Sequence, residues 1–350
     1  DLIVIGSGPA GQKAALQGAR SGKRVAVVED SGSVGGGCLH WGTMPSKSFR
    51  ESVFRWSLSS RGTFGRESEH VHVGSKKAGL PDMGRLLKRK TRVVENETQV
   101  IDELFDKAGI KTYFGRARFT GPHDIEVESS QGKRKLTGSF IVIATGARPV
   151  APSYLAVDGK LVHDSNTILS LKKIPRSMIV LGAGIIGCEY ASIFSTAGTR
   201  VTLVDRRNEV LASVDREIVE QLEGWFKAQK MEIVLEAEAT RIEHLTGRSS
   251  RAPRARVHLS TGRKVTADCV LVALGRRGNT EGLGLAQIGL QADDRGLLKV
   301  DQHFRTSLPH IYAVGDVIGS PALASTSMEQ GRIAVCHAFR VEDEREAYQM

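Results

Sequence analysis

Long apolar runs are missing from this sequence of 350 residues. No stretch approaches the roughly 18 residues that a membrane-spanning helix requires, and no signal-peptide pattern precedes the first apolar segment. Cysteine is scarce: Cys38, Cys188, Cys269 and Cys336 are widely spaced and give neither a disulfide framework nor the spacing of a metal site. We therefore expect a cytoplasmic protein with no membrane partner and no metal.

Aromatic residues are also few, at 5% of the chain, although the net charge is +10. A basic chain can bind nucleic acid, but no basic run here is interleaved with aromatic residues, so we expect no nucleic-acid partner. The charge suits anionic dinucleotide ligands, or simply a solvated surface. The Arg-rich stretch at residues 248–256 is expected to be a solvated loop.

Glycine is abundant, with 38 residues of 350 against an average usage of about 7%. Because these glycines follow no fixed period, they indicate turns and phosphate-binding loops rather than a fibrous or low-complexity chain. A length of 350 residues also suits two domains with buried cores.

One pattern occurs twice along the chain. An apolar stretch leads into Gly6-Ser-Gly-Pro-Ala-Gly11, a helical stretch, a second apolar stretch and Glu29. The same order returns with Gly182-Ala-Gly-Ile-Ile-Gly187 and Asp205, and the acidic residue follows the first glycine by the same number of positions. Each copy therefore predicts strand, tight turn, helix and strand.

This pattern is the fingerprint of a dinucleotide-binding turn. The first glycine permits the turn, the second lets the backbone approach a pyrophosphate, and the third lets helix pack on strand. Phosphate then meets the helix N-terminus, and the distal carboxylate accepts hydrogen bonds from ribose. The alternative is a pair of glycine-rich turns without ligands.

Asp205 is followed directly by Arg206 and Arg207. A carboxylate at this position suits the free 2′-hydroxyl of NAD, while an adjacent guanidinium can pair with the 2′-phosphate of NADP. Both together favour tolerance of the two nucleotides. The alternative is that both arginines are surface charges.

The rest of the chain predicts a helix that opens at Pro45 and is capped by Thr43, a glycine-containing loop near residues 62–84 and a basic helix over 85–107. Short strands are expected near residues 111–119, 124–128, 140–143, 232–235, 240–244, 255–259 and 269–273.

The segment Gly35-Gly-Gly-Cys-Leu-His-Trp-Gly-Thr-Met-Pro-Ser-Lys47 resembles the flavoprotein pyridine nucleotide–disulfide oxidoreductases. In that family two cysteines precede a Pro-x-Lys ending. Here Cys38 keeps the first cysteine position, and Thr43 stands at the second. The family's dithiol is therefore incomplete, and disulfide reduction by the family's route is not expected.

One branch of the family, the soluble (Si-specific) pyridine nucleotide transhydrogenases, resembles this chain more specifically. The resemblance includes the segment above, Gly-Cys-Glu-Tyr-Ala-Ser-Ile-Phe after the second turn, and Tyr312-Ala-Val-Gly-Asp-Val-Ile-Gly319. It implies FAD as cofactor, NAD(H) and NADP(H) as substrates, and ping-pong hydride transfer from NADPH to NAD+ without a redox disulfide. The alternatives are a relative of dihydrolipoamide dehydrogenase and a truncated, non-catalytic FAD/NAD-binding module.

The resemblance also implies an α/β fold of the glutathione reductase type. It has two Rossmann-like domains with parallel sheets and antiparallel β-meander crossovers. Residues 1–150 and 276–350 would form the FAD-binding domain, and residues 151–275 the NAD(P)-binding domain. Both ends of the chain look cut, and the family's C-terminal dimerisation domain is missing. A homodimer is implied for full-length relatives, with the state of this chain left open.

The family's site residues can be placed where the motifs match. Lys47 and Glu189 resemble an ion pair beside flavin N5, with one residue from each nucleotide unit, or a plain salt bridge between domains. Ile185 stands where some relatives have a gating tyrosine, so no aromatic gate is expected. The catalytic candidates are Lys47, Glu189, Cys38 and Thr43.

The helix that begins near residues 322–325 resembles the family helix whose N-terminus faces the flavin. The FAD-binding candidates are Gly6, Ser7, Gly8, Pro9, Ala10, Gly11, Glu29, Gly36, Gly37, Cys38, Thr43, Lys47, Ala117, Thr145, Gly146, Gly315, Asp316 and Ala324. The NAD(P)-binding candidates are Gly182, Gly184, Ile185, Ile186, Gly187, Glu189, Asp205, Arg206, Arg207 and Gly275.

Overall fold

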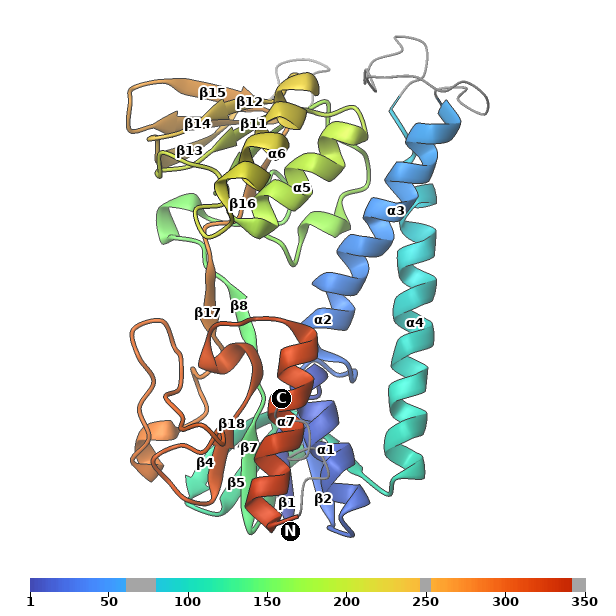
Figure 1. Cartoon of the computed structure of the whole chain (residues 1–350), viewed down its shortest axis with the longest axis vertical. Coiled ribbons are helices and arrows are strands. Elements are labelled where there is room, and N and C mark those ends of the chain that lie inside the picture. Colours follow the sequence, from blue (N-terminus) through green and yellow to red (C-terminus); the bar gives the residue numbers. More distant parts are fainter. Residues whose placement is uncertain (61–79, 246–252, 342–350) are drawn as a thin grey trace. The chain divides into compact units, whose positions relative to one another are not determined.

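The computed structural model describes residues 1–60, 80–245 and 253–341. Most of the loop expected near 62–84, and part of the Arg-rich stretch expected at 248–256, lie outside these residues. The chain forms two compact units (Figure 1). The first unit contains Asp1–His40, Val94–Arg148 and Arg276–Met350, and the second contains Trp41–Val93 and Pro149–Gly275.

The first unit is built on a parallel sheet in the order β18-β7-β1-β2-β3. Its strands are β1 (Leu2–Ile5), β2 (Val25–Glu29), β3 (Lys111–Phe114), β7 (Phe140–Ile143) and β18 (Ile311–Ala313). All four residues of β1 are buried, as expected of a central strand covered on both faces. Its neighbours β2 and β7 pair with it in parallel, so the residues that follow these strands gather at one edge.

Two helices of the first unit, α1 (Pro9–Arg20) and α7 (Ala324–Phe339), lie side by side (Figure 1). A Cβ at Gly331 would lie 2.2 Å from the Ala10 carbonyl oxygen, so a small residue is required where these helices meet. The unit also holds an antiparallel meander of β4 (Arg116–Gly121), β5 (Asp124–Ser129) and β6 (Gly132–Thr137).

The second unit repeats the plan with a parallel sheet in the order β12-β11-β10-β16-β9. Helix α5 (Ile185–Thr196) packs on α3 (Thr43–Ser60), where the Phe49 and Phe194 rings are 5.6 Å apart. Helix α6 (Arg216–Ala228) and an antiparallel meander of β13 (Ala239–Leu245), β14 (Arg254–Leu259) and β15 (Lys264–Ala267) complete it. The sheet strands are β9 (Val162–His163), β10 (Ser177–Leu181), β11 (Arg200–Val204), β12 (Glu232–Val234) and β16 (Cys269–Val272).

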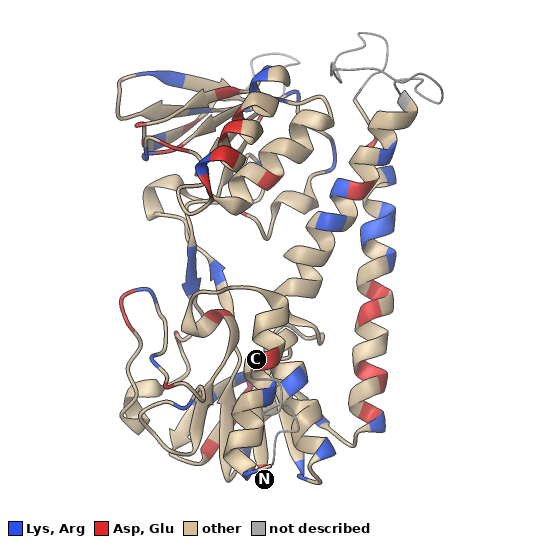
Figure 2. Ribbon diagram, in the orientation of Figure 1, with Lys and Arg blue, Asp and Glu red and all other residues tan. Residues whose placement is uncertain are grey.

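The remaining elements are short except for one helix. Helix α4 (Met83–Lys107) lies where a basic helix was expected. Its basic residues are concentrated in the first half, and acidic residues are concentrated in the second (Figure 2). The others are α2 (Gly36–His40), the paired strands β8 (Ala147–Pro149) and β17 (Arg276–Gly278), and the 3-10 turns η1 (Ser153–Leu155), η2 (Ile168–Ser170), η3 (Leu285–Ile288) and η4 (Gly315–Ile318).

The predicted fold class, α/β with parallel sheets and antiparallel meanders, is confirmed. Strands β6 and β15 were missed, because β6 is mostly polar and exposed and β15 is only four residues long with no clear apolar alternation. The expected cap at Thr43 was wrong: Ser46 N donates to the Gly42 carbonyl, so Thr43 already lies inside helix α3. The compact units also place residues 41–93 with the second nucleotide turn, whereas the sequence-based division placed them with the first.

No helix among the described residues is both long and apolar enough to cross a membrane.

Candidate functional site

The three glycines of the first turn differ in what a side chain would meet at each position. Gly6 has φ +102°, and a Cβ there would lie 2.4 Å from the Ala144 carbonyl oxygen. At Gly11 a Cβ would lie 1.9 Å from the Gly6 carbonyl oxygen, where α1 packs against the end of β1. Gly8 has open space instead, with its nearest neighbour at 4.0 Å. Packing therefore explains the first and third glycines but leaves the second free to face a ligand.

The second turn repeats this geometry. Gly182 has φ +107°, and a Cβ there would lie 2.4 Å from the Ala273 carbonyl oxygen. At Gly187 it would lie 1.8 Å from the Gly182 carbonyl oxygen, whereas Gly184 has nothing within 4 Å. The second glycine is again the open one.

Both turns present an uncovered helix N-terminus. Gly8 and Gly184 are the N-cap residues of α1 and α5, and neither cap makes a side-chain hydrogen bond. Backbone N–H groups of the first helical turn and the positive end of the helix dipole together favour an anion. Each turn can therefore hold a phosphate group.

Glu29 closes the first turn. Its side chain is buried, and one carboxylate oxygen accepts hydrogen bonds from Ser7 N at 2.9 Å and Ser7 Oγ at 2.6 Å. The other oxygen accepts from Ser31 N at 3.0 Å. Burial and the neighbouring Glu29 carboxylate raise the pKa of Asp30. Glu29 keeps acceptor capacity for a ribose hydroxyl, because these three bonds do not fill both oxygens.

The segment after β2 adds a second wall to the first turn. Gly35 N donates to Ser7 Oγ at 3.0 Å. Gly36 has φ +62°, and a Cβ there would lie 2.6 Å from the Gly8 Cα, so its backbone lies directly against the open glycine. Gly37 and Cys38 follow on helix α2, and the half-buried Cys38 forms no disulfide.

Other residues predicted to bind FAD gather around the same turn. Thr145 follows β7, its Cα would lie 3.3 Å from a Cβ at Gly6, and its buried Oγ1 has no partner among the described residues. Gly315 has φ +78° and lies against Ala10. The Gly315 N–H donates to Gln330 Oε1 at 2.8 Å. Gln330 was not predicted, and nothing in its sequence context singles it out.

Asp316 and the start of α7 complete this edge of the first unit. The Asp316 carboxylate is 3.7 Å from Arg276 Nη2, and Arg276 also donates to the Ala147 carbonyl. Ala324 is the first residue of α7, whose N-cap Leu323 makes no side-chain hydrogen bond. Ala117 lies half-buried in β4, opposite Val127.

Asp205 closes the second turn in a different way. Its carboxylate, 5% exposed, accepts from Ala183 N at 2.6 Å and from Arg207 N at 2.9 Å. Arg207 adds Nε at 3.0 Å and Nη2 at 2.9 Å as a two-point contact. Burial opposes ionisation of Asp205, but these hydrogen bonds outweigh it and hold the pKa of the carboxyl below its usual value. Arg206 is exposed.

The other nucleotide-binding candidates of the second unit lie around this turn. Gly275 has φ +133° and open space around it, in the loop that follows β16. Ile185 is 69% exposed as the first residue of α5, and Ile186 is half-buried beside it.

Lys47 and Glu189 form the predicted ion pair, with Nζ and Oε1 2.5 Å apart. Ser46 Oγ donates to the same oxygen at 3.0 Å. Both residues belong to the second compact unit, because α3 packs on α5. The expectation that this pair joins two units was therefore wrong.

The cysteines other than Cys38 are buried and lie on separate elements. Burial raises the pKa of the Cys188 thiol to about 12, with a further contribution from Asp205. Burial likewise raises the pKa of Cys269 to about 12. None of the four cysteines, all of which lie in the described residues, forms a disulfide, and Thr43 begins helix α3.

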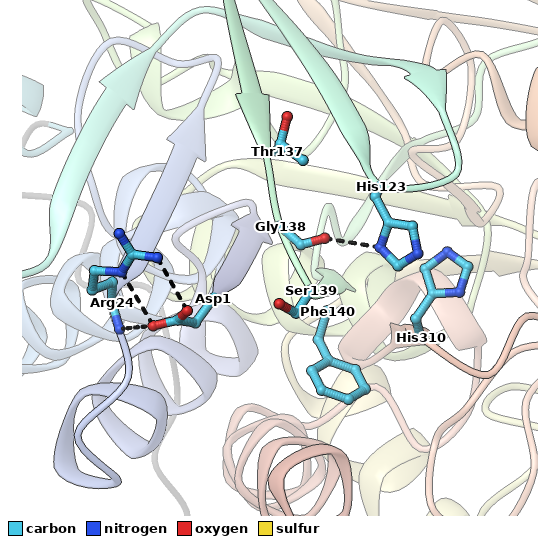
Figure 3. A pocket seen from close by; sticks show the side chains of 8 residues that line it. All are labelled: Asp1, Arg24, His123, Thr137, Gly138, Ser139, Phe140 and His310. Carbon is cyan, nitrogen blue, oxygen red and sulfur yellow. Dashed lines mark hydrogen bonds and ion pairs between the residues drawn. The ribbon is translucent and has the colours of Figure 1, made fainter.

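A cavity of about 460 Å³ lies at the opposite edge of the first sheet (Figure 3). Asp1, Arg24, Ser139 and His310 line it and precede β1, β2, β7 and β18. Ligands of parallel α/β sheets bind at the carboxyl ends of the strands, where the glycine turns lie, so this cavity is not the dinucleotide site.

Comparison with known proteins agrees with this arrangement. The family model described as "Pyridine nucleotide-disulphide oxidoreductase" matches residues 1–331. A soluble pyridine nucleotide transhydrogenase of Vibrio vulnificus is 41% identical over 95% of this chain and 69% of its own length. A protein of the same name from Mycobacterium tuberculosis is 42% identical over 97% of this chain and 70% of its own length.

Solved structures of similar fold include LpdA of Mycobacterium tuberculosis, with a TM-score of 0.85 and 28% identity over 97% of this chain and 72% of that one. The HOCl-induced flavoprotein disulfide reductase RclA of Escherichia coli has a TM-score of 0.83 and 27% identity over 98% of this chain and 72% of that one.

Proposed function

The chain belongs to the pyridine nucleotide-disulphide oxidoreductase family, and we propose that it is an FAD-dependent transhydrogenase that transfers hydride between NADPH and NAD+. One observation carries the proposal. Both dinucleotide turns are intact, while the segment that would hold the family's dithiol has Cys38 and Thr43. A chain that can bind two dinucleotides but cannot form that disulfide is suited to exchange between nicotinamides.

The first unit is proposed to hold FAD, and the second to hold NAD(P). The fit to FAD rests on the open Gly8, on Gly36 packed against it, and on the unpartnered hydroxyl of Thr145. Glu29 would accept from ribose, the first turn of α1 would bind pyrophosphate, and Asp316 would accept from the ribityl chain. When bound, FAD supplies the two-electron chemistry that nicotinamides exchange.

One nucleotide site serves both substrates in this proposal. The second unit contains a single fingerprint, so NADPH and NAD+ would occupy the turn at Gly182–Gly187 in succession. Alternate occupation of one site gives ping-pong kinetics.

Lys47 is proposed to place a positive charge beside the reacting rings. Glu189 supports this function, because its Oε1 accepts hydrogen bonds from both Lys47 Nζ and Ser46 Oγ and so fixes the position of the ammonium group. The exposed Ile185 leaves the entrance of the second turn without an aromatic residue. In this proposal these residues position the two reacting rings and stabilise the charge that develops on them. Hydride transfer itself needs no general base.

The thiols of Cys188 and Cys269 do not replace the missing dithiol. Attack on a disulfide requires a thiolate, and thiols with pKa values of about 12 stay protonated at neutral pH. Four cysteines that form no disulfide also fit a cytoplasmic location, which is part of the same proposal.

A disulfide reductase is the second candidate, because Cys38 is retained and one similar structure is a disulfide reductase. Stopped-flow spectroscopy of the FAD-loaded protein separates the two. We expect NADPH to bleach the flavin absorbance and thio-NAD+ to restore it. If only a disulfide restores the absorbance, the second candidate is correct. A chain that binds FAD but is not reduced by NADPH would be a binding module.

A further inference from the structure

We propose that Arg207 selects between the two nucleotides: its guanidinium binds the 2′-phosphate of NADP(H), and NAD(H) binds only after this group has left Asp205. The inference rests on the proposed nucleotide site of the second unit. It goes further by naming the residue that discriminates and by predicting that the resting protein is arranged for NADP(H).

The first step is that the Asp205 carboxylate is saturated. A carboxylate offers about four lone-pair positions. Arg207 N and Nε occupy one oxygen, and Ala183 N and Arg207 Nη2 occupy the other, at 2.6–3.0 Å. No acceptor position remains for a ribose 2′-hydroxyl, which is the group that distinguishes NAD.

Glu29, the equivalent acid of the first unit, shows what an available carboxylate looks like. It accepts three hydrogen bonds, all from Ser7 and Ser31, and no arginine contacts it among the described residues. One acceptor position stays open. The two turns therefore differ in whether their carboxylate can accept a hydrogen bond from a ribose hydroxyl, although their glycines have the same structural roles.

The second step is that only the Arg207 side chain has to move. The backbone on both sides is fixed: Asp205 N donates to Val234 O, and Glu236 N donates to Arg207 O, both at 3.0 Å. The Arg207 side chain is 43% exposed, whereas that of Asp205 is 5% exposed. Rotation of an exposed side chain would uncover the carboxylate without disturbing the strand.

The third step concerns the free edge of the guanidinium. Arg207 contacts Asp205 through Nε and Nη2, so Nη1 has no hydrogen-bond partner in the described part of the chain. An arginine held on one side by a carboxylate can bind a phosphate on the other. Arg206 is exposed beside it, and Glu209 is the nearby opposing charge. The guanidinium that would bind the 2′-phosphate is thus already in position, and Asp205 is the residue that positions it.

These steps predict unequal binding of the two nucleotides. NADP(H) uses Arg207 where it stands, whereas NAD(H) must first displace two hydrogen bonds between charged groups. A hydrogen bond to a charged group is worth enough to change affinity roughly 10- to 100-fold.

Calorimetric titration of the full chain with two fragments of the nucleotides tests this difference in affinity. Adenosine 2′,5′-bisphosphate and 5′-AMP differ only in the 2′-phosphate and need neither flavin nor hydride transfer. For the native protein we expect the bisphosphate to bind at least tenfold more tightly. Equal affinities, or tighter 5′-AMP, would overturn the proposal without any variant.

Two matched variants then identify the residue. Arg207→Met should weaken the bisphosphate at least tenfold and leave 5′-AMP binding unchanged or improved, because the carboxylate is uncovered. Arg206→Met removes the same charge from an exposed neighbour and should change the ratio less than threefold. The proposal is wrong if Arg206→Met causes the larger loss, or if Arg207→Met weakens both fragments equally.

Circular dichroism should first show that Arg207→Met is folded. Should it not fold, Arg207→Lys keeps the cation but loses the two-point contact, and it should retain only part of the discrimination. A native protein that passes the fragment test but fails to exchange hydride would refute the proposed function and leave this inference standing.

Discussion

Two glycines three residues apart, Gly184 and Gly187, should respond in opposite ways to the same substitution. In Gly187→Ala the new methyl would lie 1.8 Å from the Gly182 carbonyl oxygen, where real contacts do not fall below 3.0 Å. Helix α5 must therefore move by more than an ångström from the end of β10. Overpacking of this kind costs about 3 kcal/mol, offset by roughly 1 kcal/mol of helix propensity.

Gly184→Ala is the matched control. The new methyl meets nothing within 4 Å, and the backbone, at φ −80° and ψ −176°, suits any residue. The loss of an N-cap glycine and the lower entropy of the unfolded chain should offset each other within about 1 kcal/mol. The methyl would, however, point into the space through which the backbone approaches a pyrophosphate.

Thermal unfolding and NADPH titration together provide the assay. A net loss of about 2 kcal/mol lowers Tm by roughly 4–8 °C in a unit of this size, and we expect this shift for Gly187→Ala. Gly184→Ala should melt within about 2 °C of the native protein and bind NADPH at least tenfold more weakly. The reasoning fails if the two variants melt alike, or if Gly184→Ala binds NADPH normally.

Three further outcomes are expected. Glu189→Gln should slow flavin reduction by NADPH about tenfold with little change in Tm, since ion pairs at the surface contribute about 0–1 kcal/mol to stability. The control Glu51→Gln breaks the exposed ion pair with Arg55 on α3 and should leave the rate unchanged. Equal rates in both variants would show that Glu189 has no part in the mechanism. Burial, together with the charges of His303 and Arg305, lowers the pKa of His337 below its usual value of 6.5. The unfolded chain therefore binds the proton more readily, and the stability of the folded protein should fall as the pH drops through about 6.5. His337→Gln should reduce the fall in Tm between pH 7.5 and 5.5, and an unchanged fall would contradict this. Iodoacetamide at pH 8 should label Cys38 before the buried Cys188 and Cys269, as followed by mass spectrometry, and early labelling of Cys188 would contradict this order.

Local signals in the sequence were sufficient to predict the repeated units. The two glycine turns, their strands and their acidic residues obey spacing rules that steric contacts impose, and the structure shows those contacts at Gly6, Gly11, Gly182 and Gly187. Strands β6 and β15 had no such signal, because their pairing depends on neighbouring strands and not on their own apolar pattern.

Side-chain partners were not predictable in the same way. The sequence shows that Arg207 follows Asp205 by two positions, but not that its side chain turns back to cover the carboxylate. Likewise, the contact of Gln330 with the Gly315 N–H depends on how α7 packs. Such contacts are tertiary, so spacing along the chain does not encode them. The nucleotide assigned to each unit and the oligomeric state remain predictions.

The central claim is that hydride passes between nicotinamides through the bound cofactor without a disulfide. The most direct measurement is stopped-flow reduction of the FAD-loaded Cys38→Ser variant by NADPH, followed by thio-NAD+. We expect full bleaching and full recovery of the flavin absorbance, because Thr43 stands where the family has its second cysteine. Failure of thio-NAD+ to reoxidise the flavin in both the native protein and the variant would contradict the claim, and failure in the variant alone would show that the thiol takes part.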